Sequence, residues 1–199
     1  MRSQRAASNG NAVIRQAGSR DEATLVGRVA HRDLRAFEEL YRQYHLRLTR
    51  FLTNMLRRPQ LVEEVLNDTM MVVWNRADSY NGTSKVSTWI FAIAYRKALR
   101  ALRRVDEPIE DHYAETRETL EPTPEDQVGQ RQVQKALLGA MSELSADHRA
   151  VVDLTYFHEA GYREIADIMG CPVDTVKTRM FHARRRLKGL LSGRLADWL

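Results

Sequence analysis

The stretch GYREIADIMGCPVDTVKTRMFHARRRL, residues 161–187, decides the fold of the C-terminal part of the chain. Its apolar residues recur at spacings of three and four, which predicts one helix over 162–169 and a second, longer helix after it. Gly170 stands where a glycine commonly ends a helix, and Pro172 suits the first position of the next helix, where its missing N–H costs nothing. Two helices joined by this turn predict a helix-turn-helix.

The second helix of this motif has the composition expected of a helix in the major groove of DNA. Its Thr, Lys and Arg side chains near the start can reach base edges, and the arginines that follow can neutralise phosphates. A charged helical face is often only solvated, so the glycine–proline turn before the helix is what favours DNA binding. The candidate DNA-contacting residues are Thr175, Lys177, Thr178, Arg179, His182, Arg184, Arg185 and Arg186.

A second basic helix is predicted at STWIFAIAYRKALRALRR, residues 87–104. The turn signal Asn81-Gly82 precedes it, and Ser84 or Ser87 can cap its start. An amphipathic core helix with a solvated cationic face is the plain alternative. Aromatic groups beside a basic helix also suit unstacked, single-stranded bases. Two separate basic helices on one chain therefore indicate recognition of a bipartite DNA site.

Two further helices are predicted in the N-terminal half. The first begins at a cap, Asp33, and ends at Arg57-Arg58-Pro59, with cations at the helix C-terminus followed by a helix breaker. Its predicted buried stripe is Leu34, Phe37, Tyr41, Tyr44, Leu48, Phe51 and Met55. The second is LVEEVLNDTMMVVWNRA, residues 61–77, with Val62, Val65, Thr69, Val72 and Val73 facing inward and Glu64, Asn67, Asp68 and Met71 on another face.

Composition sets the class and the domain boundaries. The predicted fold is all-α, because no strand pattern persists, and the expected organisation is two small helical domains joined by an acidic linker. Between residues 105 and 126 there are nine carboxylates against one arginine, with three prolines that break any helix. The expected segments are a disordered basic tail (1–20), a first domain (21–104), the linker (105–127) and a second domain (128–199).

Bulk properties exclude several classes of protein. The single cysteine, Cys171, cannot form an internal disulfide, so a reducing cytoplasm is the expected location. The N-terminus lacks the apolar core of a secretory signal, and the longest apolar run is too short to cross a bilayer. We expect no cofactor and no metal, because we see no P-loop and no thiol cluster, and no catalytic residues. The six histidines are scattered, and HEAGY at His158 lacks the second histidine of a zinc site.

Taken together, four motifs resemble the bacterial RNA polymerase sigma factors of the extracytoplasmic-function (ECF, group 4) type in the sigma-70 family. They are AFEELYRQY, VEEVLNDTMMVVW, STWIFAIAYRKALRALRR and YREIADIMGCPVDTVKTRMFHARRRLKGLL, and the resemblance covers about residues 21–104 and 128–192. It implies a sigma-2-like domain that binds the clamp helices of the polymerase β′ subunit and reads and opens the −10 element. It also implies a sigma-4-like domain that reads the −35 element and sits on the β flap. A stand-alone helix-turn-helix regulator and an enzyme are the alternatives from other classes.

The resemblance also assigns residues. It implies core-polymerase contacts at Glu63, Glu64, Asn67, Asp68 and Met71. It implies −10 DNA contacts at Tyr80, Asn81, Ser84, Lys85, Ser87, Arg96, Lys97, Arg100, Arg103 and Arg104, with Trp89 and Phe91 packing in the core.

Several positions depart from the family pattern. Ala92 and Arg96 stand where Arg and Asn are common, Asp174 stands where Gly is common, and Leu61 replaces the first acid of the clamp-binding cluster. A weaker acidic cluster would suit activation by phosphorylation, which adds about −1.5 to −2 charges, with Thr49 or Thr53 as the acceptor. An anti-sigma factor or a Ser/Thr kinase is accordingly a further expected partner.

Overall fold

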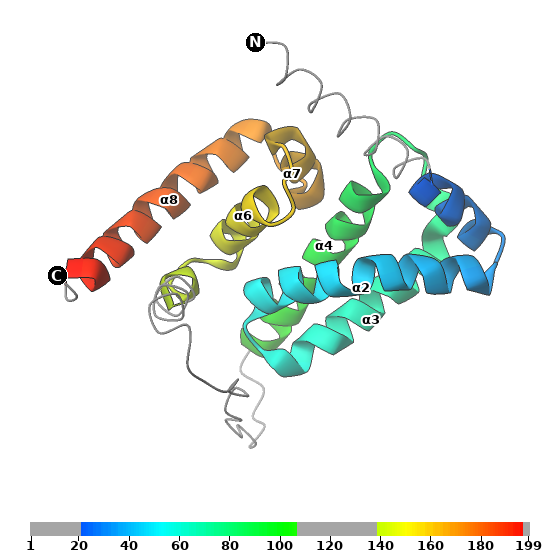
Figure 1. The fold of residues 1–199 in the computed structure, drawn as a ribbon, viewed down its shortest axis with the longest axis horizontal. Coiled ribbons are helices and arrows are strands. Elements are labelled where there is room, and N and C mark those ends of the chain that lie inside the picture. Colours follow the sequence, from blue (N-terminus) through cyan, green and yellow to red (C-terminus); the bar gives the residue numbers. More distant parts are fainter. Residues whose placement is uncertain (1–20, 107–138, 197–199) are drawn as a thin grey trace, which may run out of the picture.

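The computed structural model describes residues 21–106 and 139–196, and every regular element within these ranges is a helix, as predicted (Figure 1). The expected tail lies outside the described residues, as does nearly all of the expected linker. Residues 21–30 and 139–142 are helical. The other elements are α2 (Leu34–Leu56), α3 (Pro59–Arg76), the 3-10 helix η1 (Ala77–Ser79), α4 (Val86–Asp106), α6 (Ala146–Tyr156), α7 (Tyr162–Met169) and α8 (Val173–Ala196).

Helix α2 begins and ends where its sequence predicts. The Asp33 carboxylate accepts hydrogen bonds from the backbone N–H groups of Arg35 at 3.0 Å and Ala36 at 3.2 Å, which caps the helix. Arg57 ends the helix in the left-handed conformation, with φ 55°, and Pro59 then starts α3. The predicted buried stripe is wrong at its first member, because Leu34 lies at the exposed start of the helix with 58% of its surface accessible.

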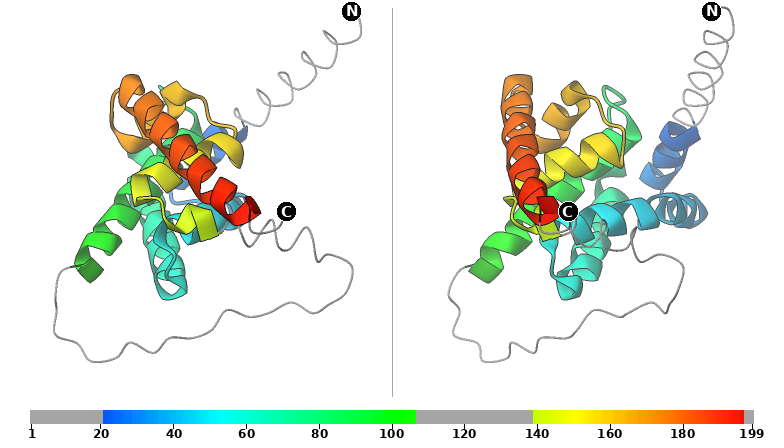
Figure 2. Two further views of the ribbon diagram at one scale, coloured as in Figure 1. Left: turned by 90° about the vertical axis from the view of Figure 1, so that its left-hand side faces the viewer. Right: turned by 60° about the vertical axis from the view of Figure 1, so that its left-hand side comes forward.

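Helix α4 is the central helix of the molecule. It packs against α2 and α3 on one side and against α7 on the other (Figures 1 and 2). This position explains why its sequence is apolar over so wide a face, since a helix covered on two sides must bury more than one stripe. Its buried residues include Ile90, Phe91, Ala92, Ile93, Ala94, Tyr95 and Ala98.

The start of α4 differs from the prediction. The helix begins at Val86, so Ser87 lies inside its first turn and does not cap it. The Ser84 hydroxyl contacts the Lys85 carbonyl at 3.5 Å. Residues 105 and 106, which were expected in the linker, belong to the last turn of this helix.

The C-terminal helices form the predicted helix-turn-helix. Gly170 ends α7 with φ 63°, in the left-handed region that glycine adopts without steric cost. Helix α8 starts at Val173, so Pro172 lies one position before the helix. Helices α7 and α8 both pack on α6, and their shared interior contains Leu154, Ile165 and Met180, all of which are fully buried.

Candidate nucleic-acid and protein-binding surfaces

The exposed face of α3 carries all five residues assigned to the polymerase contact. Glu63, Glu64, Asn67, Asp68 and Met71 are all exposed, and Met71 leaves 52% of its surface accessible. Their spacing places them along one side of the helix, while Val62, Val65 and Val73 bury the opposite side. An exposed methionine among carboxylates is an adaptable apolar contact point for a protein partner.

This α3 surface borders the basic part of α4. The Lys97 ammonium lies 3.0 Å from the Asp68 carboxylate, and the Arg104 guanidinium lies 2.7 Å from the Glu64 carboxylate. The Glu64 carboxylate raises the pKa of Arg104, so this guanidinium stays charged. Two residues assigned to DNA are therefore in contact with two residues assigned to polymerase.

The remaining cations of α4 form an exposed strip along its second half. Arg96, Arg100 and Arg103 are exposed, whereas Ala98 and Ala101 in the same part of the helix are buried. Such a strip matches the negative charge of a nucleic-acid backbone. Of the two α4 residues expected to pack in the core, Phe91 is buried, as expected, and Trp89 is half-buried and packs against the core.

The loop between η1 and α4 is held in shape by its own side chains. The Tyr80 hydroxyl donates to the Ser84 carbonyl at 2.6 Å, and the Asn81 side-chain oxygen accepts from the Thr83 N–H at 3.1 Å and the Thr83 hydroxyl at 2.7 Å. The Tyr80 and Trp89 rings pack with their centroids 5.5 Å apart. Burial raises the pKa of Tyr80. Tyr80 and Trp89 therefore position this loop, while Asn81 remains exposed at its tip.

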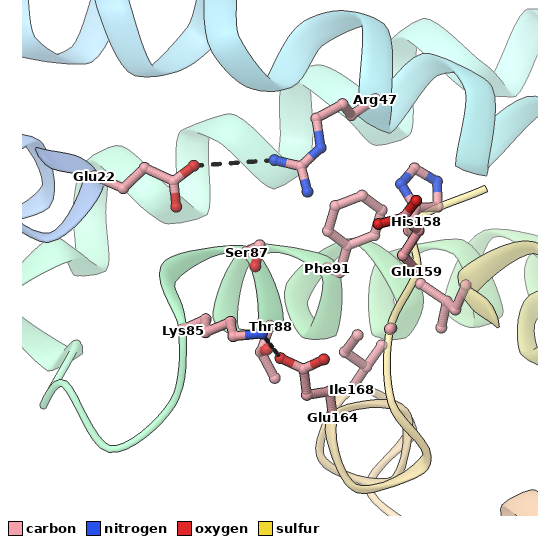
Figure 3. Close-up of a pocket in the computed structure, with 12 residues that line it drawn as sticks. Glu22, Arg47, Lys85, Ser87, Thr88, Phe91, His158, Glu159, Glu164 and Ile168 are labelled. Atoms are coloured by element: carbon pink, nitrogen blue, oxygen red, sulfur yellow. Dashed lines mark ion pairs between the residues drawn. The ribbon is translucent and has the colours of Figure 1, made fainter. Parts of the chain in front are cut away.

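The end of this loop meets the C-terminal half of the molecule. Lys85 forms an ion pair with Glu164 of α7, beside a cavity of about 280 Å³ that Ser87 also lines (Figure 3). Across the cavity, Arg47 of α2 lies 4.0 Å from Glu22. Burial alone would raise the pKa of Glu164, but the hydrogen bonds from Lys85 and from the Gly161 N–H together lower it. Two members of the assigned −10 set, Lys85 and Ser87, thus lie at the contact between the halves.

The exposed side of α8 carries most of the residues assigned to the −35 element. Lys177 and Thr178 contact Asp174: the ammonium lies 2.9 Å from its carboxylate, and the hydroxyl donates to its carbonyl at 2.9 Å. His182, Arg185 and Arg186 are exposed, Thr175 is half-buried, and Arg184 donates to the Tyr156 hydroxyl at 3.2 Å.

Arg179 departs from this arrangement. Its guanidinium turns toward α6, where it lies 2.5 Å from the Asp147 carboxylate and 3.8 Å from Cys171 Sγ. Its sequence spacing alone placed it on the outward stripe. Nothing in the spacing could show that a carboxylate from α6 would lie beside it.

The two threonines considered for phosphorylation have different surroundings. The Thr49 side chain is half-buried, and its hydroxyl donates to the His45 carbonyl at 2.8 Å within the helix. Thr53 is exposed near the end of α2. Exposure makes Thr53 the more accessible hydroxyl of the two.

Two kinds of feature are absent from residues 21–106 and 139–196. In the described ranges, no group of three or more His, Cys, Asp or Glu side chains is arranged to hold a metal ion. None of the helices in these ranges has the length and apolar character needed to span a membrane.

The sequence matches two regions of one protein family. The family model described as Sigma-70 region 2 matches residues 40–107, and the one described as Sigma-70, region 4 matches residues 134–187. The ECF RNA polymerase sigma factor RpoE of Cereibacter sphaeroides is 31% identical over 164 residues, which cover 81% of this chain and 90% of that protein. The ECF RNA polymerase sigma factor SigM of Bacillus subtilis is 29% identical over 163 residues, covering 80% and 98%.

Solved structures show the same architecture. The sigma factor RpoE of Bartonella quintana, solved in complex with the anti-sigma factor NepR, aligns with a TM-score of 0.60 at 26% identity, covering 78% of this chain and 96% of that one. CnrH, solved in complex with the cytosolic domain of CnrY, aligns with a TM-score of 0.65 over 87% of this chain and 98% of that one. At 21% identity the likeness to CnrH concerns the fold alone.

Proposed function

The chain belongs to the ECF group of the sigma-70 family, transcription initiation factors that direct RNA polymerase to promoters, and we propose how its two halves divide this work. The N-terminal half, residues 21–104, binds core polymerase and the −10 element. The C-terminal half, residues 128–199, binds the −35 element. The observation that carries this division is that α4 and α8 each present exposed cations, on helices that belong to different family regions.

The polymerase contact is proposed for the α3 face. Glu63, Glu64, Asn67 and Asp68 supply negative and polar groups, and Met71 supplies an apolar one, for the clamp helices of β′. A polar and charged rim around an exposed apolar anchor is the usual composition of a protein interface. The pairs Lys97–Asp68 and Arg104–Glu64 would place this contact directly beside the −10 DNA.

The −10 element is proposed to meet the loop 80–85 and the cationic strip of α4. Extracting a base from the stack costs a few kcal/mol, and stacking it on an aromatic ring returns roughly 1–3 kcal/mol per base. Binding alone could therefore hold an opened base without nucleotide hydrolysis, and the role needs no catalytic residue. Asn81 is exposed at the loop tip, and Arg96, Arg100 and Arg103 would hold the phosphates.

The −35 element is proposed to meet α8. Lys177, Arg185 and Arg186 are exposed along the helix that follows the turn, and a helix in this position enters the major groove in other helix-turn-helix proteins. Removing one phosphate contact should lower the slope of log affinity against log salt by about one. Replacing a base-contacting residue should instead relax specificity at one position.

One related structure indicates a further class of protein partner. RpoE of Bartonella quintana is solved with an anti-sigma factor, and we propose that an anti-sigma factor also binds this chain. A Ser/Thr kinase acting at Thr49 or Thr53 remains a second proposal for control. The proposed place of action is the bacterial cytoplasm, where the polymerase works.

The deciding experiment is transcription by purified core polymerase with and without this protein, on sheared genomic DNA from the source organism, with the RNA 5′ ends sequenced. New start sites that share two motifs at a fixed spacing are expected. The variant Arg186→Ala should weaken them, whereas Arg42→Ala, which removes an exposed arginine on α2, should not. New starts absent with core binding intact would point to a missing activating signal. Absence of both would favour a stand-alone helix-turn-helix regulator.

A further inference from the structure

The cavity of about 280 Å³ beside Lys85 has walls from both halves of the chain (Figure 3). Part of its wall is apolar, because Phe91 of α4, Leu154 of α6 and Ile168 of α7 line it, and each is at most 3% exposed. Sites for small molecules are concave, largely apolar and carry a few convergent polar groups. This cavity has that composition, and the proposed recognition of promoter DNA does not require a cavity here.

The charged side chains of the cavity wall nearly balance one another. Arg47 and Lys85 supply two positive charges, and Glu22, Glu159 and Glu164 supply three negative charges. The ion pair of Arg47 with Glu22 lies across the cavity from that of Lys85 with Glu164 (Figure 3). A pure anion would face the three carboxylates, and a pure cation would face the two cations. A ligand that carries one charge of each sign is therefore the best electrostatic match.

Arg47 is suited to bind the negative group of such a ligand. Its guanidinium lies 4.0 Å from the Glu22 carboxylate, which is longer than a direct hydrogen bond. The guanidinium is also held over the rings of Tyr44 and Phe91, at 4.9 Å and 5.6 Å from their centroids. Aromatic packing thus fixes its position, while its planar fork of N–H groups remains suited to a ligand carboxylate.

Two hydroxyl groups at the start of α4 also belong to the cavity wall. Thr88 is 4% exposed and Ser87 is half-buried. Within the described residues neither hydroxyl forms a hydrogen bond, whereas Thr69 and Thr155 each donate to a carbonyl of their own helix. A buried hydroxyl without a partner in the protein needs an explanation, and a polar group of a ligand in the cavity supplies one.

The loop from α6 to α7 contributes a strained residue to the same cavity. Glu159 has a φ of 50°, in the left-handed region that few residues other than glycine adopt. Strain of this kind persists only where the surrounding structure holds it, and it clusters at ligand sites. The loop brings the Glu159 carboxylate to the wall, together with the imidazole of His158, whose side chain is 6% exposed.

We propose that this cavity binds a small zwitterion, namely a free α-amino acid with an apolar side chain. The ligand carboxylate binds the Arg47 guanidinium, and the ligand ammonium donates to the Glu164 carboxylate and the Thr88 hydroxyl. The ligand side chain lies against Phe91 and Ile168. Because the wall comes from both halves, occupancy stabilises the folded chain by mass action.

The first test is isothermal titration calorimetry of the full-length chain with L-valine, L-leucine, L-isoleucine, L-methionine and L-phenylalanine. We expect at least one of these probes to bind at a ratio of one to one with a Kd below about 1 mM. The amine that lacks its carboxylate and the acid that lacks its ammonium should each bind at least about tenfold more weakly, since each leaves a charged group of the wall without its partner. Binding by none of the five, or equal binding by the amine or the acid, would overturn the proposal.

The second test replaces residues of the wall and compares each with a matched control. Arg47→Gln should weaken the best probe at least about tenfold, whereas Arg42→Gln removes an exposed arginine of the same helix and should not. Thr88→Val keeps the shape of the side chain and should weaken the probe about threefold to tenfold. Thr155→Val is its control, because the Thr155 hydroxyl donates to the Val151 carbonyl at 2.8 Å within α6. Affinities that do not differ between each variant and its control would contradict the assigned site.

The place of binding is measured by methyl NMR of the full-length chain with labelled isoleucine. The δ1 methyl signal of Ile168, assigned by its loss in Ile168→Leu, should shift during titration with the best probe. The signal of Ile93, which is buried on α4 but does not line the cavity, should not shift. A shift at Ile93 without one at Ile168 would place the ligand elsewhere and overturn the proposal. None of these readouts uses DNA or polymerase, so their result is independent of the proposed −10 contacts of Lys85 and Ser87.

Discussion

The Tyr95 hydroxyl on α4 donates a 2.6 Å hydrogen bond to the Asp147 carboxylate on α6, so a tyrosine of the N-terminal half is bound to an acid of the C-terminal half. Burial, together with this carboxylate, raises the pKa of Tyr95 well above its usual value, so the hydroxyl remains a donor. Replacing Tyr95 with Phe removes the bond but leaves Asp147 paired with Arg179. We expect the free energy of unfolding to fall by about 1–2 kcal/mol in urea denaturation.

The control for this change is Tyr156→Phe. Tyr156 is 56% exposed, and its hydroxyl accepts only a surface bond from Arg184. Its loss should change the free energy of unfolding by less than about 0.5 kcal/mol. Equal effects of the two substitutions would show that the bond between α4 and α6 contributes nothing to the folded chain.

Phe91 of α4 packs against aromatic side chains from both halves of the chain. It is 2% exposed and packs edge-on against Phe51, with ring centroids 5.3 Å apart, and against His158 of the C-terminal half. Phe91→Ala should lower the free energy of unfolding by about 3–5 kcal/mol, because it removes the ring and leaves a cavity. Phe181→Ala, at a position 61% exposed on α8, should change it by less than about 0.5 kcal/mol in the same measurement.

Local features of this fold could be predicted because they depend on neighbours in the sequence. The Asp33 cap, the break at Pro59 and the glycine turn at Gly170 are each decided within a few residues, and each was found where it was expected. The helical class and the helix-turn-helix follow from the same short-range periodicity. The proposed assignment of residues to −10 or −35 DNA came from the family resemblance, and it stays a prediction.

The contacts between distant segments could not be predicted in this way. Lys85 and Glu164 are far apart in the sequence, and their ion pair depends on how α4 docks on α7. Arg179 has the sequence spacing of an outward-facing residue, yet its guanidinium forms an ion pair with Asp147 of α6. Periodicity tells which side of a helix is apolar, whereas the identity of the group that lies opposite is decided only by tertiary packing.

The ion pair of Glu164 predicts that the free energy of unfolding depends on pH. Its pKa in the folded chain is lowered from the ordinary value of 4.5, since the bonds from Lys85 and the Gly161 N–H outweigh burial. The stabilisation is therefore fully present above the ordinary pKa and is lost as the pH falls through the lowered value. We expect the difference in free energy of unfolding between wild type and Glu164→Gln to shrink over that range.

Urea denaturation of the two proteins from neutral to acidic pH measures this difference. Repeating the series in about 1 M salt should reduce the difference at neutral pH, because the Lys85 side chain is 61% exposed and its charge is screened. A difference that stays constant with both pH and salt would mean that the pair with Lys85 does not contribute.

If the exposed face of α3 contacts core polymerase, removing one of its negative charges should weaken that binding. Asp68 is exposed beside Glu64 and Met71, and it is paired with Lys97 in the free chain. Asp68→Asn should weaken binding to core polymerase about threefold to tenfold, mainly through a slower association rate at low salt. Asp78→Asn removes the same charge from the exposed 3-10 helix η1, at a residue that is not assigned to the contact, and should leave the association rate unchanged. Surface-captured core polymerase and a stopped-flow signal would measure both rates, and equal rates would remove Asp68 from the proposed contact.

Two glycines of the helix-turn-helix half should respond to alanine with opposite signs. Gly170 ends α7 at φ 63°, where a Cβ meets no neighbouring atom but the backbone conformation itself is unfavourable for alanine. Gly170→Ala should therefore lower the free energy of unfolding by about 1 kcal/mol. Gly189 lies inside α8 with open space around it, so Gly189→Ala should raise the free energy by about 0.5–1 kcal/mol through helix propensity. Urea denaturation followed by circular dichroism would measure both, and stabilisation by Gly170→Ala would contradict the left-handed turn between α7 and α8.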